Sequence, residues 1–179
     1  MDYHGEFESD DERALVHIPM AMRYRLDKAG IKLTLMQWQA LPMALRRRVL
    51  ELPCDTNTAI DDFQRELTAL IKGLIDENVT RFKVSRPYAW QRERVPDELN
   101  VALREAQCDT ITNDVWRQLS DFRRYVLVVL ARPGRVSSRL PSALQEFCHD
   151  LQHESIVLMD SRAAVTPFVP PTHRGPAQV

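Results

Sequence analysis

The segment from Arg81 to Arg94 combines basic and aromatic side chains in a pattern that can bind another macromolecule. The segment contains several basic residues and one acidic residue, Glu93, and aromatic residues are interleaved with the basic ones. The candidate partner-binding residues in this segment are Arg81, Arg86, Tyr88, Trp90, Arg92 and Arg94. Arg, Tyr and Trp are enriched among the residues that contribute most to protein–protein binding. The segment therefore predicts a contact with a protein partner.

Two other interpretations of this segment stay open. Basic residues with aromatic neighbours also bind single-stranded nucleic acid, through phosphate contacts and base stacking. The net charge of −1 and the lack of a nucleic-acid-binding motif weigh against that interpretation. The segment can also be a structural loop, because no helical period survives in it and Pro87 interrupts any strand. A loop of this length is nevertheless typical of functional surfaces.

Two histidines near the C-terminus have a spacing that can bind a metal ion. His149 and His153 lie at positions i and i+4 of a predicted helix, and Cys148 is their neighbour. However, Cys148 falls on the apolar stripe of that helix, and position 150 is Asp where a zinc-protease motif has Glu. The pattern favours a solvated histidine face, and we expect neither a metal site nor another cofactor.

Cys54 and Cys108 lie at or near predicted helix N-termini, where the helix dipole stabilises a thiolate. No nearby histidine supplies a base, so buried turn cysteines are the favoured interpretation. Three cysteines are too few for a disulfide scaffold and fit a reducing cytoplasm. The sequence also has no glycine-rich phosphate loop, nucleophile elbow or dinucleotide fingerprint. We therefore predict a protein that is not an enzyme.

The elements that must position these side chains are helices, and their signals are clearest between Val16 and Thr58. Pro19 suits a first helical position and Gly30 a left-handed exit. Thr34 and Gln37 have the spacing of a capping box. The predicted helices are 19–29, 35–41, 42–52, 59–79, one that begins at Pro96, 113–131 and 141–153.

These elements predict an all-α fold, a single-domain bundle of six or seven helices packed around 59–79 and 113–131. Residues 1–14 are predicted to be a mobile acidic lead-in anchored by Phe7, residues 15–160 the helical domain, and residues 161–179 a disordered or loosely docked Pro-rich tail. Gly73 within an apolar stripe predicts close packing against another helix.

An internal echo is visible between residues 54–58 and residues 108–112. Both segments begin Cys-Asp-Thr and end in Thr, and each stands between two predicted helices. Helix-capping chemistry explains part of this likeness, because Asp and Thr satisfy free amide groups at a helix start. A degenerate duplication of helical hairpins is the other interpretation.

Composition is that of a globular protein, with 44% hydrophobic and 27% charged residues. The acidic N-terminus lacks the basic-then-apolar pattern of a signal peptide. The longest apolar run, Tyr125 to Ala131, is far shorter than the ~20 residues of a membrane-spanning helix. We therefore expect a cytoplasmic protein.

A set of residues in the N-terminal third carries a resemblance to a known family: Phe7-Glu8, Ile18-Pro19-Met20, Arg23, Leu26-Asp27, Gly30-Ile31-Lys32-Leu33, Trp38 and Pro53-Cys54. In these residues the chain resembles the nitrate reductase associated protein family. The resemblance covers roughly residues 5 to 55. The family has no agreed catalytic residues, so none is carried over to this chain. What it implies is an accessory role in nitrate assimilation, supporting or maturing a molybdoenzyme through a protein partner such as nitrate reductase or its maturation machinery.

Overall fold

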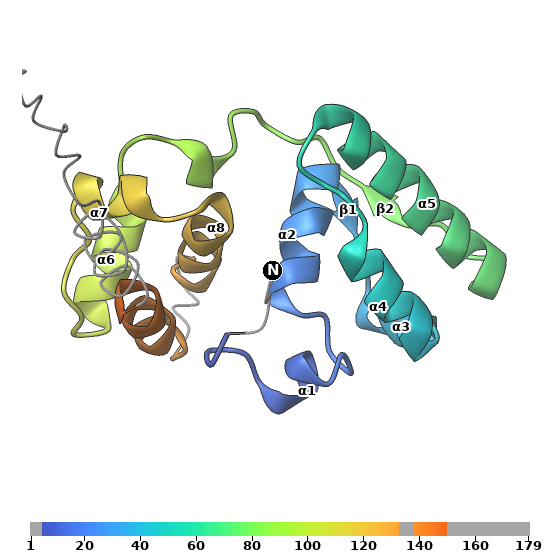
Figure 1. Cartoon of the computed structure of the whole chain (residues 1–179), viewed down its shortest axis with the longest axis horizontal. Coiled ribbons are helices and arrows are strands. Elements are labelled where there is room, and N and C mark those ends of the chain that lie inside the picture. Colours follow the sequence, from blue (N-terminus) through green and yellow to red (C-terminus); the bar gives the residue numbers. More distant parts are fainter. Residues whose placement is uncertain (1–4, 133–137, 150–179) are drawn as a thin grey trace, which may run out of the picture.

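The computed structural model describes residues 5–132 and 138–149, which are mostly helical, so the predicted all-α class is confirmed (Figure 1). The helices are α1 (Asp10–Arg13), α2 (Met20–Ala29), α3 (Leu35–Ala40), α4 (Met43–Glu51), α5 (Asn57–Ile75), the 3-10 helix η1 (Ala89–Gln91), α6 (Asp97–Glu105), α7 (Asn113–Gln118) and α8 (Asp121–Leu130). Residues 140–149 are also helical. Strands β1 (Ile31–Lys32) and β2 (Thr80–Arg81) form a small antiparallel sheet. The predicted tail, 161–179, lies outside the described residues.

The predicted start and stop signals of the first helices are confirmed. Helix α2 follows Pro19 and ends at Gly30, whose φ of 65° is left-handed. A β-carbon at Gly30 would also lie 2.6 Å from the Phe82 carbonyl oxygen, so both backbone angle and space require glycine there. Thr34 and Gln37 form the predicted capping box at the start of α3.

The predicted helix 113–131 is wrong, because the structure divides it into α7 and α8. Leu119 is extended, with φ −70° and ψ 139°, and Ser120 caps α8 by accepting a hydrogen bond from the Arg123 amide. The predicted packing of Gly73 is also wrong, since nothing lies within 4 Å of a β-carbon built there. Helical period alone does not reveal either outcome, because Ser120 continues the polar face and Gly73 has no side chain.

The buried side chains form two hydrophobic clusters that divide the chain. One cluster contains only residues between Leu15 and Val79. The other contains residues from Tyr88 to Phe147, together with Phe7 and Met20. Figure 1 shows α3, α4 and α5 on one side of the molecule, α6, α7 and α8 on the other, and α2 between them. Helix α2 packs against both α5 and α8 and joins the two clusters.

The two halves contain the same four helices in the same order, and we call them the first repeat (15–75) and the second repeat (92–149). Each repeat has a helix that follows a proline (α2, α6), a short helix capped by threonine (α3, α7), a third helix (α4, α8) and a fourth (α5, residues 140–149). Pro96 follows Pro19 by 77 positions, and Thr112 follows Thr34 by 78. Gln107, at the place of Gly30, is also left-handed, with φ 57°.

A buried tryptophan occupies the same place in each repeat. Trp38 and Trp116 are both fully buried. The indole of Trp38 donates to the Leu15 carbonyl at 2.9 Å, and that of Trp116 donates to the Arg92 carbonyl at 2.8 Å. Each tryptophan thereby ties its short helix to the segment that precedes the first helix of its repeat.

An arginine accompanies each tryptophan at the same spacing. The guanidinium carbon of Arg46 lies 5.8 Å from the Trp38 ring centroid, and that of Arg124 lies 5.4 Å from the Trp116 ring centroid. Both guanidinium groups also donate to main-chain carbonyls of the short helix. The duplication therefore has a register of 77 or 78 residues. The echo at 54–58 and 108–112 does not mark it, because the first segment precedes the fourth helix of its repeat and the second precedes the short helix.

Candidate functional site

The segment between Arg81 and Arg94 joins the two repeats. Its first residues continue β2, and the Phe82 amide donates to the Gly30 carbonyl at 2.9 Å. Its last residues precede α6, where the Arg92 carbonyl accepts the hydrogen bond from Trp116. The lack of periodicity in this segment thus has a structural cause, because a connection between two repeats crosses their surface without a helix of its own beyond η1.

Two of the candidate partner-binding residues, Tyr88 and Trp90, are not available at the surface, since they are only 6% and 8% exposed. Their rings stack with centroids 4.6 Å apart, and the Trp90 ring meets Tyr125 of α8 edge-on at 4.9 Å. Tyr24 of α2 packs against both Trp90 and Tyr125. The two aromatic residues fill the space between the repeats and do not offer a stacking platform to a ligand.

Hydrogen bonds fix the same aromatic residues to α2. The Tyr125 hydroxyl donates to Asp27 at 2.9 Å, and the Tyr88 hydroxyl donates to the Lys28 carbonyl at 3.1 Å. Burial raises the pKa of Tyr125, and the charge of Asp27 raises it further, so this hydroxyl stays a donor. Arg132 lies 3.6 Å from the same carboxylate. The interface between the repeats is therefore aromatic with polar contacts at its edge.

The arginines of the segment remain at the surface. Arg81, Arg92 and Arg94 are exposed. Arg86 is also exposed, but its guanidinium hydrogen-bonds to Asn57 and lies 5.7 Å from the Tyr88 ring centroid. Of the six predicted site residues, the structure thus leaves four cations accessible and turns two aromatic residues inward. Whether these cations bind a partner stays a prediction.

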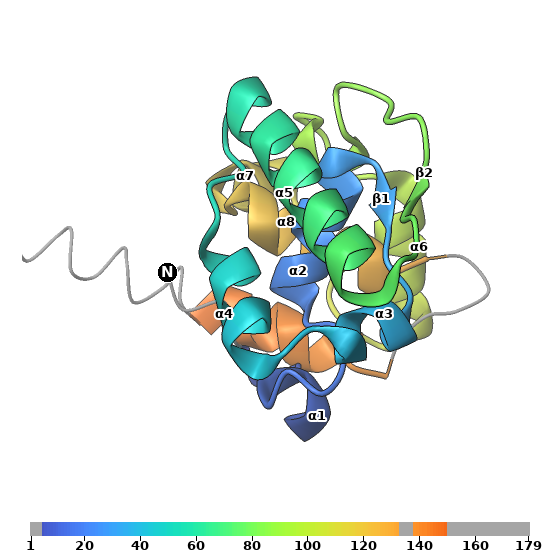
Figure 2. The ribbon, with the colours of Figure 1, turned by 90° about the vertical axis from the view of Figure 1, so that its right-hand side faces the viewer.

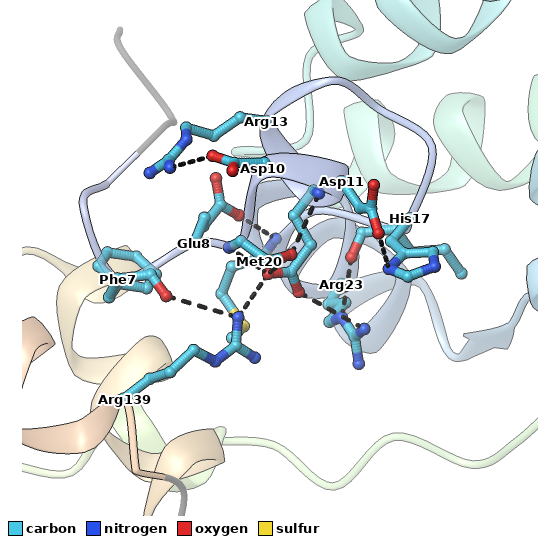
Figure 3. A network of polar contacts seen from close by, with 12 residues as sticks. Phe7, Glu8, Asp10, Asp11, Arg13, His17, Met20, Arg23 and Arg139 are labelled. Carbon is cyan, nitrogen blue, oxygen red and sulfur yellow. Dashed lines mark hydrogen bonds and ion pairs between the residues drawn. The ribbon is translucent and has the colours of Figure 1, made fainter.

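A buried polar network holds the N-terminal segment against the body (Figure 3). The Glu12 side chain is 4% exposed and accepts from Arg139, which precedes the fourth helix of the second repeat. Burial raises the pKa of Glu12, but hydrogen bonds from Ser9 and Arg139 outweigh it and leave the pKa below its ordinary value. Arg23 of α2 lies 3.8 Å from the other carboxylate oxygen. One carboxylate thus contacts both repeats.

Glu8 extends this network to the start of α2. Its carboxylate accepts from the Met20 amide at 2.6 Å, which satisfies a free N–H group in the first turn of the helix. Phe7 is buried as predicted and packs edge-on against Phe147, with ring centroids 5.5 Å apart. Residues 5–14, predicted to be a mobile lead-in, are therefore packed between the repeats. The spacing of Ser9 and Glu12, a capping box, is the signal that could have revealed this.

The cysteines and histidines do not converge in the described part of the chain. Cys54 belongs to the first hydrophobic cluster, whereas Cys108 packs against the second. Burial raises the pKa of Cys54 although Lys28 and Arg25 lower it, and burial also raises the pKa of Cys148. His153 lies outside the described residues. Among residues 5–132 and 138–149 no group of three or more His, Cys, Asp or Glu side chains can hold a metal ion.

Comparison with known proteins identifies one family. A family model described as conserved nitrate reductase-associated protein matches residues 5–147, which span both repeats. No curated protein and no solved structure matches the chain. Among the residues that the structure describes, no helix combines the length and the apolar content needed to cross a membrane.

Proposed function

The chain belongs to the conserved nitrate reductase-associated protein family, and on that premise we propose that it is a non-enzymatic accessory protein of nitrate assimilation. It supports or matures nitrate reductase, a molybdoenzyme, by protein–protein contact with the enzyme or its maturation machinery. The observation that carries the proposal is the family match over both repeats, since the name of the family links it to this enzyme. Its work is in the cytoplasm, and the unpaired state of its cysteines fits a reducing compartment.

The exposed arginines of the connecting segment support a contact surface for a protein. The backbone that carries Arg92 and Arg94 is held in place, because the buried side chains of Trp90 and Tyr88 anchor the same segment in the aromatic interface. Arginine forms bidentate hydrogen bonds with carboxylates and is enriched in binding hot spots. The alternative function, a nucleic-acid-binding regulator, is less supported, because Tyr88 and Trp90 are buried and Phe82 alone remains as an exposed aromatic side chain of the segment.

Co-purification with nitrate reductase tests this function. A tagged chain, expressed from its own locus in cells grown on nitrate, should retain nitrate reductase, and deletion of the gene should lower the activity of the enzyme. Replacing Arg92 and Arg94 together by Glu should reduce retention several-fold, whereas Arg104→Glu on α6, an exposed arginine outside the segment, should leave it unchanged. Unaltered nitrate reductase activity and nitrate growth in the deletion strain would contradict the proposal.

A further inference from the structure

The first repeat carries an exposed apolar corner where α3 turns into α4. The exposed apolar residues of this corner are Leu35, Met36, Ala40, Pro42, Met43 and Ala44. Met36 is 81% exposed, and Leu35 and Met43 are about two-fifths exposed. Figure 2 looks onto the first repeat and shows α3 and α4 on the side away from the second repeat. We call this surface the apolar corner. Contiguous exposed apolar side chains on a soluble protein mark interaction sites.

The second repeat provides an internal control for this surface. At the positions of Leu35, Met36, Ala40, Pro42 and Met43 it has Asn113, Asp114, Gln118, Ser120 and Asp121. The backbone is the same in both repeats, since each short helix has six residues, a threonine cap and an extended leucine at its end. The second repeat therefore keeps this arrangement with polar residues at the corner. The arrangement itself does not require the apolar residues of the first repeat.

The counterparts of the apolar corner on α7 stay exposed in the second repeat, but the adjoining face of α8 is occupied. Phe122 and Tyr125 of α8 pack against Tyr24 of α2, and the Tyr125 hydroxyl donates to Asp27 of that helix. Helix α8 buries four of its residues, whereas α4 buries only Val49. A helix therefore covers this face of α8, and the corresponding face of α4 is open.

The residues of the open face define what can cover it. Ala44 stands at the position of Phe122, so the face of α4 has room for a large apolar side chain of an incoming helix. Arg47 stands at the position of Tyr125, whose partner on α2 is the carboxylate of Asp27. Within the described residues Arg47 forms no ion pair. An acidic residue on the incoming helix would satisfy it, as Asp27 satisfies Tyr125.

From this geometry we propose that the apolar corner, with Arg47 at its rim, binds an amphipathic helix of nitrate reductase. The bound helix places an apolar residue over Ala44 and a carboxylate against Arg47, as α2 does over Phe122 and Tyr125 of α8. It also extends over Met43 and Met36, beyond the area that α2 covers in the second repeat, where Asp114 is exposed. This inference rests on the proposed function and names a second part of the chain, besides the connecting segment, that contacts the enzyme. A second copy of this chain is a poorer occupant, because its counterpart of α2 is α6, which has Arg104 at the position of Asp27 and would place a cation against Arg47.

Binding of the purified full chain to nitrate reductase of the same organism tests the proposal. The probe is the intact enzyme, and biolayer interferometry gives the dissociation constant. The double variant Met36→Asp with Met43→Asp installs the residues of the second repeat and should weaken binding at least tenfold. Arg47→Glu should weaken it several-fold and reduce its dependence on salt. Val101→Asp, at an exposed apolar residue of α6, should bind like the wild type.

The outcomes separate this inference from the proposed function. Weak binding of the corner variants, with thermal unfolding midpoints like that of the wild type, supports both. Equal binding of wild type and corner variants overturns the corner as the contact site and leaves the accessory role standing. No binding of the wild type to the enzyme overturns this inference and confines the accessory role to the maturation machinery, whereas only an unaltered deletion strain overturns the accessory role itself. A wild-type dimer that the corner variants dissociate, measured by sedimentation velocity, makes the corner a self-association surface and also overturns the inference.

A cross-linking experiment locates the contact directly. A photo-reactive residue at position 36 should cross-link to a helical segment of nitrate reductase that carries apolar and acidic residues. The same residue at position 114, the equivalent place in the second repeat, should give no such product. Products from position 114 but not from position 36 would overturn the inference.

Discussion

The two repeats share a framework and differ in their surfaces. Both bury a tryptophan whose indole donates to a carbonyl, and both place an arginine over that ring. At the corner beside this framework the first repeat exposes methionine and leucine, whereas the second has asparagine and aspartate. Residues that stay the same in both copies maintain the fold, and residues that differ reflect what each copy contacts.

The difference in contacts explains how two similar units make one asymmetric molecule. The α8 face of the second repeat packs against α2 of the first, but the α4 face of the first repeat packs against no third unit in the described chain. Such head-to-tail packing always leaves one face of this kind uncovered at the end of the array. In repeat proteins an uncovered terminal face is made polar or is used for binding. The apolar residues of the first repeat favour binding.

The largest expected change in the free energy of unfolding tests whether the two hydrophobic clusters are equivalent. Trp38→Ala and Trp116→Ala should each lower the free energy of unfolding by about 3–5 kcal/mol, because each removes a fully buried ring and its hydrogen bond. Denaturant titration followed by circular dichroism measures both. Trp90→Phe is the control for the indole hydrogen bond, since the indole N–H of Trp90 has no acceptor in the described part of the chain. A large loss from only one of the two alanine variants would contradict the equivalence.

The next effect concerns the N-terminal segment, which lies between the repeats. Glu12→Gln should lower the free energy of unfolding at neutral pH by about 2 kcal/mol, because a buried carboxylate loses its charge-assisted hydrogen bonds. Since folding lowers the pKa of Glu12, its contribution is complete above the ordinary carboxyl pKa and is lost as the pH falls through the lowered value.

Unfolding titrations at a series of pH values test this prediction. The wild type and Glu12→Gln should differ most at neutral pH and converge in acid. Asp10→Asn is the control, because the Asp10 carboxylate is 96% exposed and, within residues 5–132 and 138–149, forms an ion pair only with Arg13. A difference that is independent of pH would show that the glutamate stabilises the fold by packing and not by its charge.

A smaller effect compares Tyr125 with Arg47, which stand at the same position of the two repeats. Tyr125→Phe should cost roughly 1.5 kcal/mol, because its hydroxyl donates to the charged carboxylate of Asp27 across the interface. Arg47→Ala should change stability by less than about 0.5 kcal/mol, as expected of an exposed side chain. Thermal and denaturant unfolding measure both variants. Equal losses would indicate that the α4 face is covered in the free protein.

The sequence predicts the local part of this structure and misses the part that depends on long-range contacts. Caps and prolines locate α2, α3 and α4, because these signals act within one turn of the helix. The break between α7 and α8 escapes periodicity, although Ser120 is a good helix cap. The duplication is hidden because the two copies share mainly buried and capping positions, and one inserted residue shifts the register from 77 to 78.

The candidate site shows the same division. The surface position of Arg81, Arg92 and Arg94 follows from their charge. The burial of Tyr88 and Trp90 could not be predicted, because the rings that cover them come from α2 and α8, far away in the sequence. The exposure of the apolar corner could not be predicted from the sequence for a related reason. Leucine and methionine at helical spacing look like core residues until the structure leaves them exposed.

The smallest effect distinguishes a structural role of the apolar corner from a binding role. Met36 is in the first turn of α3, where Asp114 of α7 has its counterpart. An acidic residue in the first turn interacts favourably with the helix dipole, so Met36→Asp should raise the free energy of unfolding by about 0.5 kcal/mol. Asp114→Met should lower the free energy of unfolding by a similar amount. Replicate denaturant titrations measure whether each variant is more or less stable than the wild type. If Met36 packed against the fold, its replacement would destabilise the chain. A variant that gains folding stability but no longer binds nitrate reductase would show that the methionine is retained for the partner.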